Sequence, residues 1–198
     1  MSRAGLKLEA ALDGFELDVA GMRCADLGCH AGGFTDCLLQ HGATAVHALD
    51  TGYGVLDYRL RTDPRVTVME RTNALHCQPP ETVDLVTIDV GWTKQRHVIP
   101  AALQWLGGVP GGLIITLVKP HYELDETQRE TLLRDGAISH ADAGTVVERT
   151  VAGFEALGAR PIAVLISPLT GAKSSRRGGA GNREYLVLAK KRTVSSAP

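Results

Sequence analysis

The sequence predicts a doubly wound α/β fold, in which helices cover both faces of a mostly parallel sheet. Helical and strand-like patterns alternate along most of the 198 residues, and this alternation is typical of β-α-β units with right-handed crossovers. In addition, residues 83–90 and 113–118 are near-continuous apolar runs, which are expected of parallel strands covered on both faces. The chain is 44% hydrophobic, enough to fill one core, and we expect a single domain over residues 1–193.

A helix opens the predicted order of elements. Leu8, Ala11 and Leu12 recur at the spacing of one helix face. This pattern predicts an amphipathic helix over residues 4–15, within an N-terminal segment over residues 1–16. The elements that follow are a strand over residues 23–28, a helix over 34–40 closed by Gly42, and strands over 43–50 and 66–69.

The second half of the chain continues the alternation. Its elements are a strand over residues 83–90, a helix through Ile99, Leu103 and Leu106, a strand over 113–118, helices over 126–134 and 147–158, and strands over 161–167 and 184–190. A loop rich in glycine, serine and arginine separates the last two strands. The small polar residues 194–198 are predicted to be a disordered tail.

Composition and residue spacing exclude several classes of protein. The chain has no run of about 18 apolar residues, so no membrane-spanning helix is predicted. The first residues lack the apolar segment of a secretory signal, so we expect a cytoplasmic protein. The 4 cysteines form no Cys-x-x-Cys pair and the 7 histidines no His-x-x-x-His pattern, so no metal site is predicted. We expect a monomer.

Charge is distributed unevenly along the chain. From Gly171 to Thr193, seven basic residues stand against Glu184 alone, so this segment carries +6 whereas the whole chain carries −1. A basic segment on an otherwise acidic protein indicates a polyanionic partner that binds on one side. A solvated basic tail is the alternative that charge alone leaves open.

Candidate ligand-binding residues follow the predicted strands, as expected of a doubly wound sheet. A glycine-rich loop at residues 26–36 follows the first strand, and its backbone can approach a ligand closely. His30 stands where a dinucleotide-binding loop needs its second glycine, which disfavours NAD. Asp50 can accept both hydroxyls of a ribose, and Asn73 can bind an adenine edge. These residues favour a nucleoside without phosphates, such as S-adenosylmethionine, and turn formation alone is the structural alternative.

Several motifs resemble the FtsJ/TlyA group of RNA 2′-O-methyltransferases, and the resemblance covers almost the whole chain. They are Ser2-Arg3-Ala4-Gly5-Leu6-Lys7-Leu8, the loop at residues 26–36, Asp50-Thr51-Gly52-Tyr53-Gly54, Glu70-Arg71-Thr72-Asn73, Lys119-Pro120-His121-Tyr122-Glu123, Ser167-Pro168, and Arg183-Glu184-Tyr185-Leu186. The resemblance implies a Rossmann-like fold that binds S-adenosylmethionine, with a seven-stranded sheet whose last strand is antiparallel. It also implies RNA, in particular ribosomal RNA, as the partner.

The resemblance extends to individual site residues. The family's catalytic Lys-Asp-Lys-Glu tetrad corresponds to Lys7, Asp89, Lys119 and Glu184. The implied cofactor-binding residues are Asp26, Gly28, His30, Gly32, Gly33, Phe34, Asp50, Thr72, Asn73 and Asp89. The basic loop that precedes Glu184 borders this site, so we expect RNA phosphates to contact Lys173, Arg176, Arg177 and Arg183, together with Arg3.

Methyl transfer to a ribose hydroxyl requires that the hydroxyl is oriented and its proton removed. We expect Lys119 to take or steer this proton while Asp89 orients Lys119. Lys7 would stabilise the developing alkoxide, and Glu184 would hold the hydroxyl or Lys7. A nearby cation lowers the pKa of a lysine and an anion raises it, so the protonation of Lys119 depends on distances. A plain buried ion pair of Asp89 and Lys119 is the structural alternative.

Two departures from TlyA-type relatives leave the RNA target open. The chain begins at the opening motif, where those proteins usually carry an S4 RNA-binding domain, and Asp89 is followed by Val-Gly-Trp-Thr-Lys-Gln-Arg. Two other functions compete with this one: a non-catalytic RNA-binding or ribosome-associated protein that keeps the fold, and a small-molecule O-methyltransferase. Trp92, Tyr53 and Tyr122 can stack a base, although we favour packing in the core or at the rim for these rings.

Overall fold

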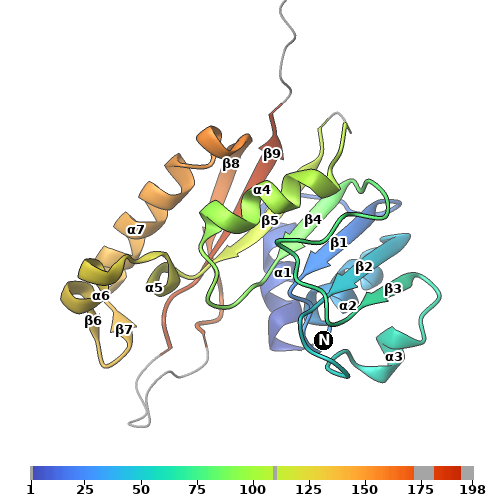
Figure 1. Cartoon of the computed structure of the whole chain (residues 1–198), viewed down its shortest axis with the longest axis horizontal. Coiled ribbons are helices and arrows are strands. Elements are labelled where there is room, and N and C mark those ends of the chain that lie inside the picture. Colours follow the sequence, from blue (N-terminus) through green and yellow to red (C-terminus); the bar gives the residue numbers. More distant parts are fainter. Residues whose placement is uncertain (1, 109–110, 172–180, 193–198) are drawn as a thin grey trace, which may run out of the picture.

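A computed structural model describes residues 2–108, 111–171 and 181–192, and its centre is a seven-stranded sheet (Figure 1). The strand order is β3-β2-β1-β4-β5-β9-β8, and β9 runs antiparallel to both of its neighbours whereas the other neighbouring pairs are parallel. The strands are β1 (Arg23–Leu27), β2 (Ala45–Leu49), β3 (Val66–Met69), β4 (Leu85–Ile88), β5 (Leu113–Val118), β8 (Ala159–Ile166) and β9 (Tyr185–Lys191). The predicted α/β class and the antiparallel last strand are confirmed.

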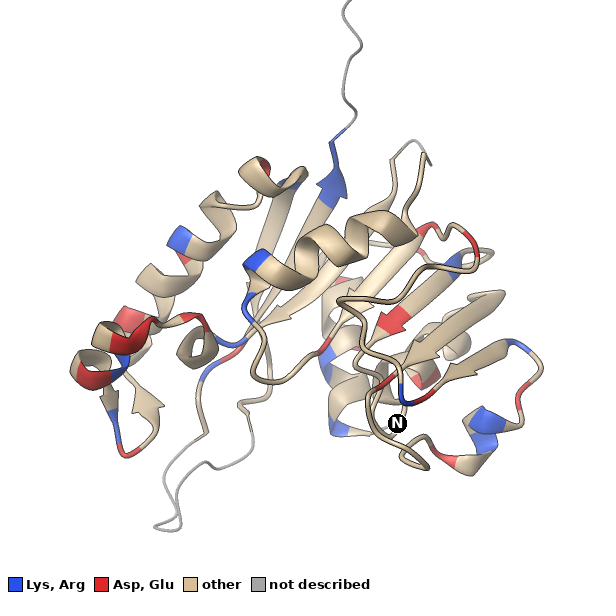
Figure 2. Ribbon diagram, viewed as in Figure 1, with Lys and Arg blue, Asp and Glu red and all other residues tan. Residues whose placement is uncertain are grey.

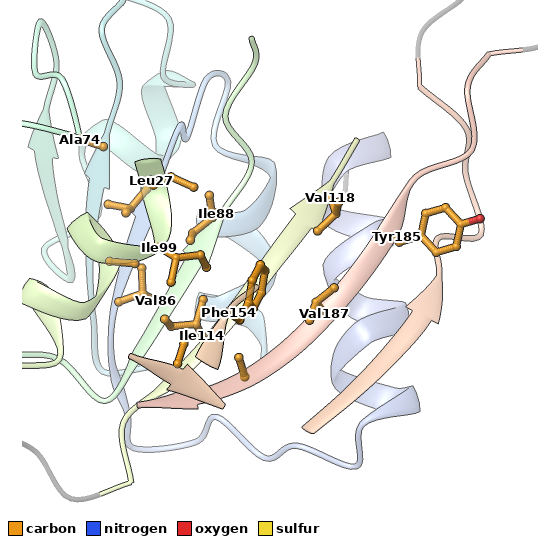
Figure 3. Packing of buried hydrophobic residues seen from close by; sticks show 14 of the residues in the cluster. Leu27, Ala74, Val86, Ile88, Ile99, Ile114, Val118, Phe154, Tyr185 and Val187 are labelled. Atoms are coloured by element: carbon orange, nitrogen blue, oxygen red, sulfur yellow. The ribbon is translucent and has the colours of Figure 1, made fainter. Parts of the chain in front are cut away.

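Helices cover both faces of this sheet. In Figure 1, α1 (Arg3–Gly14) and α2 (Gly33–Gln40) lie behind the sheet, and α4 (Gln95–Trp105) and α7 (His140–Ala152) lie in front. Consecutive side chains of a strand point to opposite faces of the sheet and pack into different apolar clusters. In β4, for example, Leu85 packs with the α1–α2 layer and Val86 with the α4–α7 layer. Figure 3 shows the second cluster, in which Ile99 of α4 and Phe154 lie over Ile114 of the sheet. Burial on both faces explains the near-continuous apolar runs.

The N-terminal helix is well defined by its own residues. Ser2 is the N-cap, and its hydroxyl accepts a hydrogen bond from Gly5 N at 3.3 Å. Leu8, Ala11 and Leu12 are buried against the sheet, as their spacing predicts. Lys7 is buried as well, although it is charged. The helix therefore carries one lysine inward, toward the sheet.

The segment between β5 and α7 differs from the sequence prediction of one helix over residues 126–134. There α6 (Glu126–Leu132) is shorter, and β6 (Leu133–Arg134) pairs with β7 (Ala137–Ile138) as a hairpin. The turn residues Asp135 and Gly136 have φ values of 51° and 80°, and an Asp-Gly pair with positive φ is typical of a two-residue hairpin turn. The Asp-Gly pair is the signal in the sequence for this hairpin, and α6 ends before it, at Leu132.

Other boundaries also differ from the prediction. The helix expected from residue 147 begins at His140, because the Ser139 side chain accepts from Asp142 N and starts the helix there. After Ala152 the chain forms a 3₁₀ helix at Glu155–Leu157 instead of continuing α7. The short helices α3 (Tyr58–Arg61) and α5 (Pro120–Glu123) were not predicted. The predicted tail, residues 194–198, lies outside the described residues.

Within the described ranges, the protein has no helix with both the length and the apolar character that crossing a membrane requires.

Candidate active site

Strand direction places three of the tetrad residues at one edge of the sheet. Asp89 directly follows β4 and Lys119 directly follows β5, so both lie at the carboxyl ends of parallel strands. Glu184 directly precedes the antiparallel β9, so it lies at the same edge. The register pairs Val118 with Tyr185, which sets Lys119 and Glu184 opposite each other. Lys7 reaches this edge from α1.

The four side chains form two ion pairs. Lys119 Nζ donates to Asp89 Oδ1 at 2.6 Å, and Lys7 Nζ donates to Glu184 Oε2 at 2.5 Å. In the first pair the side chains are 16% and 19% exposed, whereas in the second they are 11% and 3% exposed. Four segments that are far apart in the chain therefore meet as two lysine–carboxylate pairs.

The electrostatic balance at Lys119 favours its charged form. Burial lowers the pKa of Lys119, but the carboxylate of Asp89, with a smaller contribution from Glu184, raises this pKa above its ordinary value. The contribution of Glu184 means that the two ion pairs lie within electrostatic reach of each other. The positive charge of Lys7 does not reverse this balance, since Glu184 pairs with it. In the protein alone, Lys119 is an ammonium group at neutral pH.

A cavity of about 690 Å³ opens at the same edge of the sheet, within the size range of small-molecule sites. Lys119 and Arg3 line it. Most residues predicted to bind a cofactor line it too: Gly28, His30, Gly33, Phe34, Asp50, Thr72, Asn73 and Asp89. The glycine-rich loop, the ends of β2 and β3 and the Lys119–Asp89 pair thus share one cavity.

The glycine-rich loop passes very close to the end of β4. Gly28 has a φ of 88°, and a Cβ at this position would lie 2.6 Å from the carbonyl oxygen of Asp89, so only glycine fits. Further along the loop, His30 N donates to Asp50 Oδ2 at 2.9 Å, while Gly52 N donates to Asp50 Oδ1 at 2.7 Å. These bonds fix the carboxylate of Asp50 at the cavity wall, and each of its oxygens can still accept another hydrogen bond.

Two of the predicted cofactor-binding residues, Asp26 and Gly32, do not line this cavity. Asp26 is fully buried, and its Oδ2 accepts from the backbone N and the hydroxyl of Thr35 at 2.9 and 2.7 Å. Position 26 points toward the α1–α2 layer because strand side chains alternate, so the carboxylate holds the start of α2. Burial raises the pKa of Asp26 to about 7. Asp26 and Gly32, the N-cap of α2, therefore shape the loop from behind, and their direct contact with a cofactor stays a prediction.

Glu70 does not line the cavity, but it holds the neighbouring loop in a way that sequence reasoning missed. Its Oε1 accepts from Arg61 Nη2 at 2.5 Å and from Val55 N at 3.1 Å. Backbone hydrogen bonds first, and Arg61 second, lower the pKa of Glu70 to about 2. Glu70 thereby fixes the loop that follows Asp50. A signal was available, since Glu70 directly follows β3 at the edge where the other site residues gather.

Exposed aromatic rings lie at the rim of the cavity. Trp92 lines the cavity, is 84% exposed and has a φ of 62°. Its ring contacts that of Tyr122, with centroids 4.9 Å apart. Tyr53 is exposed as well, and the guanidinium of Arg71 lies 4.2 Å from its ring centroid. These rings pack on rim residues, and Trp92 presents most of its surface to solvent.

The predicted RNA-contacting residues are described only in part. Lys173, Arg176 and Arg177 lie outside the described residues. Arg3 Nη2 donates to Thr170 O at 3.3 Å, which links α1 to the segment before the basic loop. At the ends of that loop, Gly171 N donates to Asn182 O at 2.9 Å. The next residue, Arg183, is half-buried beside Glu184.

The strand order and the cavity at the carboxyl edge are those of the fold of S-adenosylmethionine-dependent methyltransferases. A solved structure with this fold is the N-methyltransferase NodS from Bradyrhizobium japonicum WM9. It superposes with a TM-score of 0.58 at 15% identity, covering 96% of this chain and 95% of that one. At this identity the likeness concerns the fold alone. The model of the FtsJ-like methyltransferase family matches residues 1–191. The chain therefore belongs to the FtsJ-like methyltransferase family.

Individual relatives agree with this assignment. The chain is 38% identical over 193 residues to YqxC of Bacillus subtilis (strain 168), covering 94% of this chain and 64% of that protein. It is 37% identical over 201 residues to the 16S/23S rRNA (cytidine-2′-O)-methyltransferase TlyA of Mycobacterium tuberculosis (strain CDC 1551 / Oshkosh), covering 98% and 69%. A solved structure from Streptococcus thermophilus superposes with a TM-score of 0.85 at 34% identity, covering 96% of this chain and 66% of that one. The chain thus spans about two thirds of the length of these relatives.

Proposed function

We propose that this chain transfers a methyl group from S-adenosylmethionine to a ribose 2′-hydroxyl of RNA, and that ribosomal RNA is the substrate. The observation that carries the proposal is the meeting of two lysine–carboxylate pairs at the edge of one cavity. TlyA of Mycobacterium tuberculosis, at 37% identity, is named as an rRNA (cytidine-2′-O)-methyltransferase, which supports the choice of RNA class.

The cavity residues fit S-adenosylmethionine. The close backbone at Gly28 and the fixed carboxylate of Asp50 suit a nucleoside, whose ribose hydroxyls Asp50 would accept. Asn73 Oδ1 already accepts from Leu75 N at 2.9 Å, so its amide nitrogen would donate to the adenine. When bound, S-adenosylmethionine supplies an activated methyl group on a positively charged sulfur. The protein's remaining task is to orient the hydroxyl and to move its proton.

In the proposed mechanism, Lys119 changes role between two states. As an ammonium group it donates to the ribose oxygen and orients it, with Asp89 holding Nζ at 2.6 Å. It would accept the hydroxyl proton only after releasing its own proton to solvent, and a cation in the cavity beside it would make this release easier. Asp89 opposes this loss, because its negative charge raises the pKa of Lys119. The position of Asp89 therefore tunes how readily Lys119 serves as the base.

Lys7 and Glu184 act beside this pair. Glu184 fixes Lys7 Nζ at 2.5 Å, and the ammonium group has further N–H donors with which it would stabilise the developing alkoxide. Glu184 is thus a positioning residue for Lys7. The exposed rim of the cavity, with Trp92 84% exposed, favours a large substrate over a small one enclosed by a lid.

The test is to incubate the purified protein with ribosomal RNA and S-adenosylmethionine labelled in its methyl group, and then to map the product. The expected product is a 2′-O-methyl ribose at a defined nucleotide. Methylation of a base nitrogen would contradict the proposed chemistry. Binding of RNA without binding of S-adenosylmethionine, measured by calorimetry, would support a non-catalytic RNA-binding protein instead.

A further inference from the structure

We propose that a second basic site, the α4–α7 groove, binds the phosphate backbone of the RNA substrate next to the reacting centre. This groove lies between the start of α4 and the helices α6 and α7, and the residues of its wall used here are Lys94, Arg96, Glu123, Asp125 and Arg149. The proposal rests on the proposed RNA substrate. It adds a surface on described residues, separate from the loop that precedes Glu184.

The groove gathers cations around a hollow of the right size for phosphate groups. Its volume is about 280 Å³. Arg96 and Arg149 are exposed and Lys94 is half-buried, and Arg129 lies close enough to lower the pKa of Lys94, after burial and Arg96. Figure 2 shows basic segments at the start of α4 and within α7, with acidic segments on α6.

These cations differ from the arginines of α3 and of the segment that follows it. On the opposite side of the cavity, Arg59 and Arg65 each pair with a carboxylate of their own segment, Asp57 and Asp63. In the described parts of the chain, no carboxylate oxygen lies within salt-bridge distance of Lys94, Arg96, Arg129 or Arg149. Arg149 instead donates to Gln128 Oε1 at 3.1 Å. Arg96 Nε likewise donates to a side chain that is no carboxylate, His97 Nε2 at 3.1 Å. Cations that repel one another and have no carboxylate partner suit an external anion.

The two carboxylates in the groove are already engaged by helix ends. Glu123 Oε1 accepts from Gln95 N at 2.9 Å, at the first residue of α4. Asp125 is the N-cap of α6 and accepts from Gln128 N at 2.8 Å. Because each carboxylate faces a helix N-terminus, neither neutralises an arginine directly. The wall of the groove therefore holds two acids and three bases, a net charge of +1.

The groove adjoins the reacting centre, because the segments that follow β4 and β5 lead from one to the other. Lys94 follows Asp89 by five residues, and Glu123 follows Lys119 by four. The contact between Trp92 and Tyr122 joins these two segments. A ribose held at Lys119 would place the flanking strand across Trp92 and its phosphates in the groove, a combination of aromatic and basic contacts that is typical of single-stranded nucleic-acid binding.

The experiment measures RNA affinity at several salt concentrations for the full chain. The double substitution Arg96→Ala/Arg149→Ala should weaken binding of ribosomal RNA about tenfold at low salt. It should also reduce the slope of log affinity against log salt, by roughly 0.7 to 0.9 for each lost phosphate contact. Arg96→Lys/Arg149→Lys should retain most of the slope, since the charges remain.

The matched control is Arg160→Ala/Arg192→Ala, which removes the same charge from exposed positions at the opposite edge of the sheet. It should leave the affinity and the slope near those of the unsubstituted protein. An unchanged slope in Arg96→Ala/Arg149→Ala, or an equal loss in the control, would overturn the proposed groove. Absence of methyl transfer by the unsubstituted protein would instead refute the proposed function, so the two failures are distinguishable.

Discussion

The two ion pairs of the candidate site use the same residue types but lie in different surroundings. The Lys119–Asp89 pair joins the ends of two neighbouring strands, lines the cavity and keeps 16% and 19% of its side chains exposed. The Lys7–Glu184 pair joins α1 to the start of β9, is 11% and 3% exposed, and does not line the cavity. One pair thus lines the cavity, whereas the other connects a helix to the sheet beside it.

This difference predicts a division of labour. A pair that lines a cavity can exchange protons with a substrate, and its loss should affect rate more than folding. A pair that is nearly buried holds two elements together, and removal of one partner leaves an uncompensated charge in the interior. Both pairs should therefore be needed for methyl transfer, but only the second should contribute strongly to stability.

The largest effect is expected from Lys119→Ala. It should reduce the rate of methyl transfer about 10²- to 10⁴-fold, because general acid–base catalysis typically contributes this much. The affinity for S-adenosylmethionine, measured by calorimetry, should stay within about twofold. Lys190→Ala is the control, since Lys190 lies near the opposite end of β9. Normal turnover by Lys119→Ala would show that this pair is structural only.

The next largest effect concerns the buried pair. Lys7→Met or Glu184→Leu alone should lower the free energy of unfolding by about 3 to 5 kcal/mol, because each leaves one charge unpaired in the interior. The double variant should regain most of this stability, since apolar side chains of similar volume replace the pair. Urea denaturation measures both. The double variant should remain inactive, and recovery of methyl transfer would contradict a role for Lys7 at the alkoxide.

A third prediction extends the comparison to Asp26, a buried acid held by hydroxyl and amide groups instead of a cation. Its pKa is raised from 3.8 to about 7, so its contribution to stability is complete below about pH 4 and is lost as the pH rises through 7. Relative to Asp26→Asn, the protein should lose roughly 3 to 4 kcal/mol between these pH values, since one pKa unit corresponds to about 1.4 kcal/mol. Urea denaturation across this pH range measures the difference in free energy of unfolding between the protein and Asp26→Asn. A difference that does not change with pH would contradict a raised pKa of Asp26.

The fold and much of the site follow from the sequence, for identifiable reasons. Burial on both faces makes β4 and β5 continuous apolar runs, and residues directly after such strands gather at one edge. Asp50, Asp89 and Lys119 could be located by this rule alone. The role of Asp26 could not be predicted in this way, because the direction of a strand side chain depends on which face of the sheet the next helix covers. The hairpin at Asp135–Gly136 was missed because its two strands have only two residues each, too few to show the alternating pattern of a strand.

Sequence patterns did not indicate which side chains from distant segments contact each other. The resemblance to the FtsJ/TlyA group named Lys7 and Glu184, but nothing local indicates that residue 7 contacts residue 184 at 2.5 Å. Likewise, the α4–α7 groove collects Lys94, Arg96 and Arg149 from separate helices, so no run of basic residues marks it. Charge counting along the chain found the segment at residues 171–193 because its bases are contiguous in sequence.

The smallest effect, a displacement of the pH profile, gives the sharpest contrast between the pairs. Because Asp89 raises the pKa of Lys119, methyl transfer should become faster as the pH rises from 7 to 9, by up to about tenfold per unit. In Asp89→Asn the lost negative charge should lower the pKa of Lys119, since only the smaller contributions of Glu184 and Tyr122 then oppose burial, and shift the normalised profile to lower pH. Glu184→Gln should shift it less, because Glu184 contributes less to this pKa and pairs with Lys7. A profile that moves equally in both variants would mean that the two pairs act as one charge cluster, not as a reacting pair and a positioning pair.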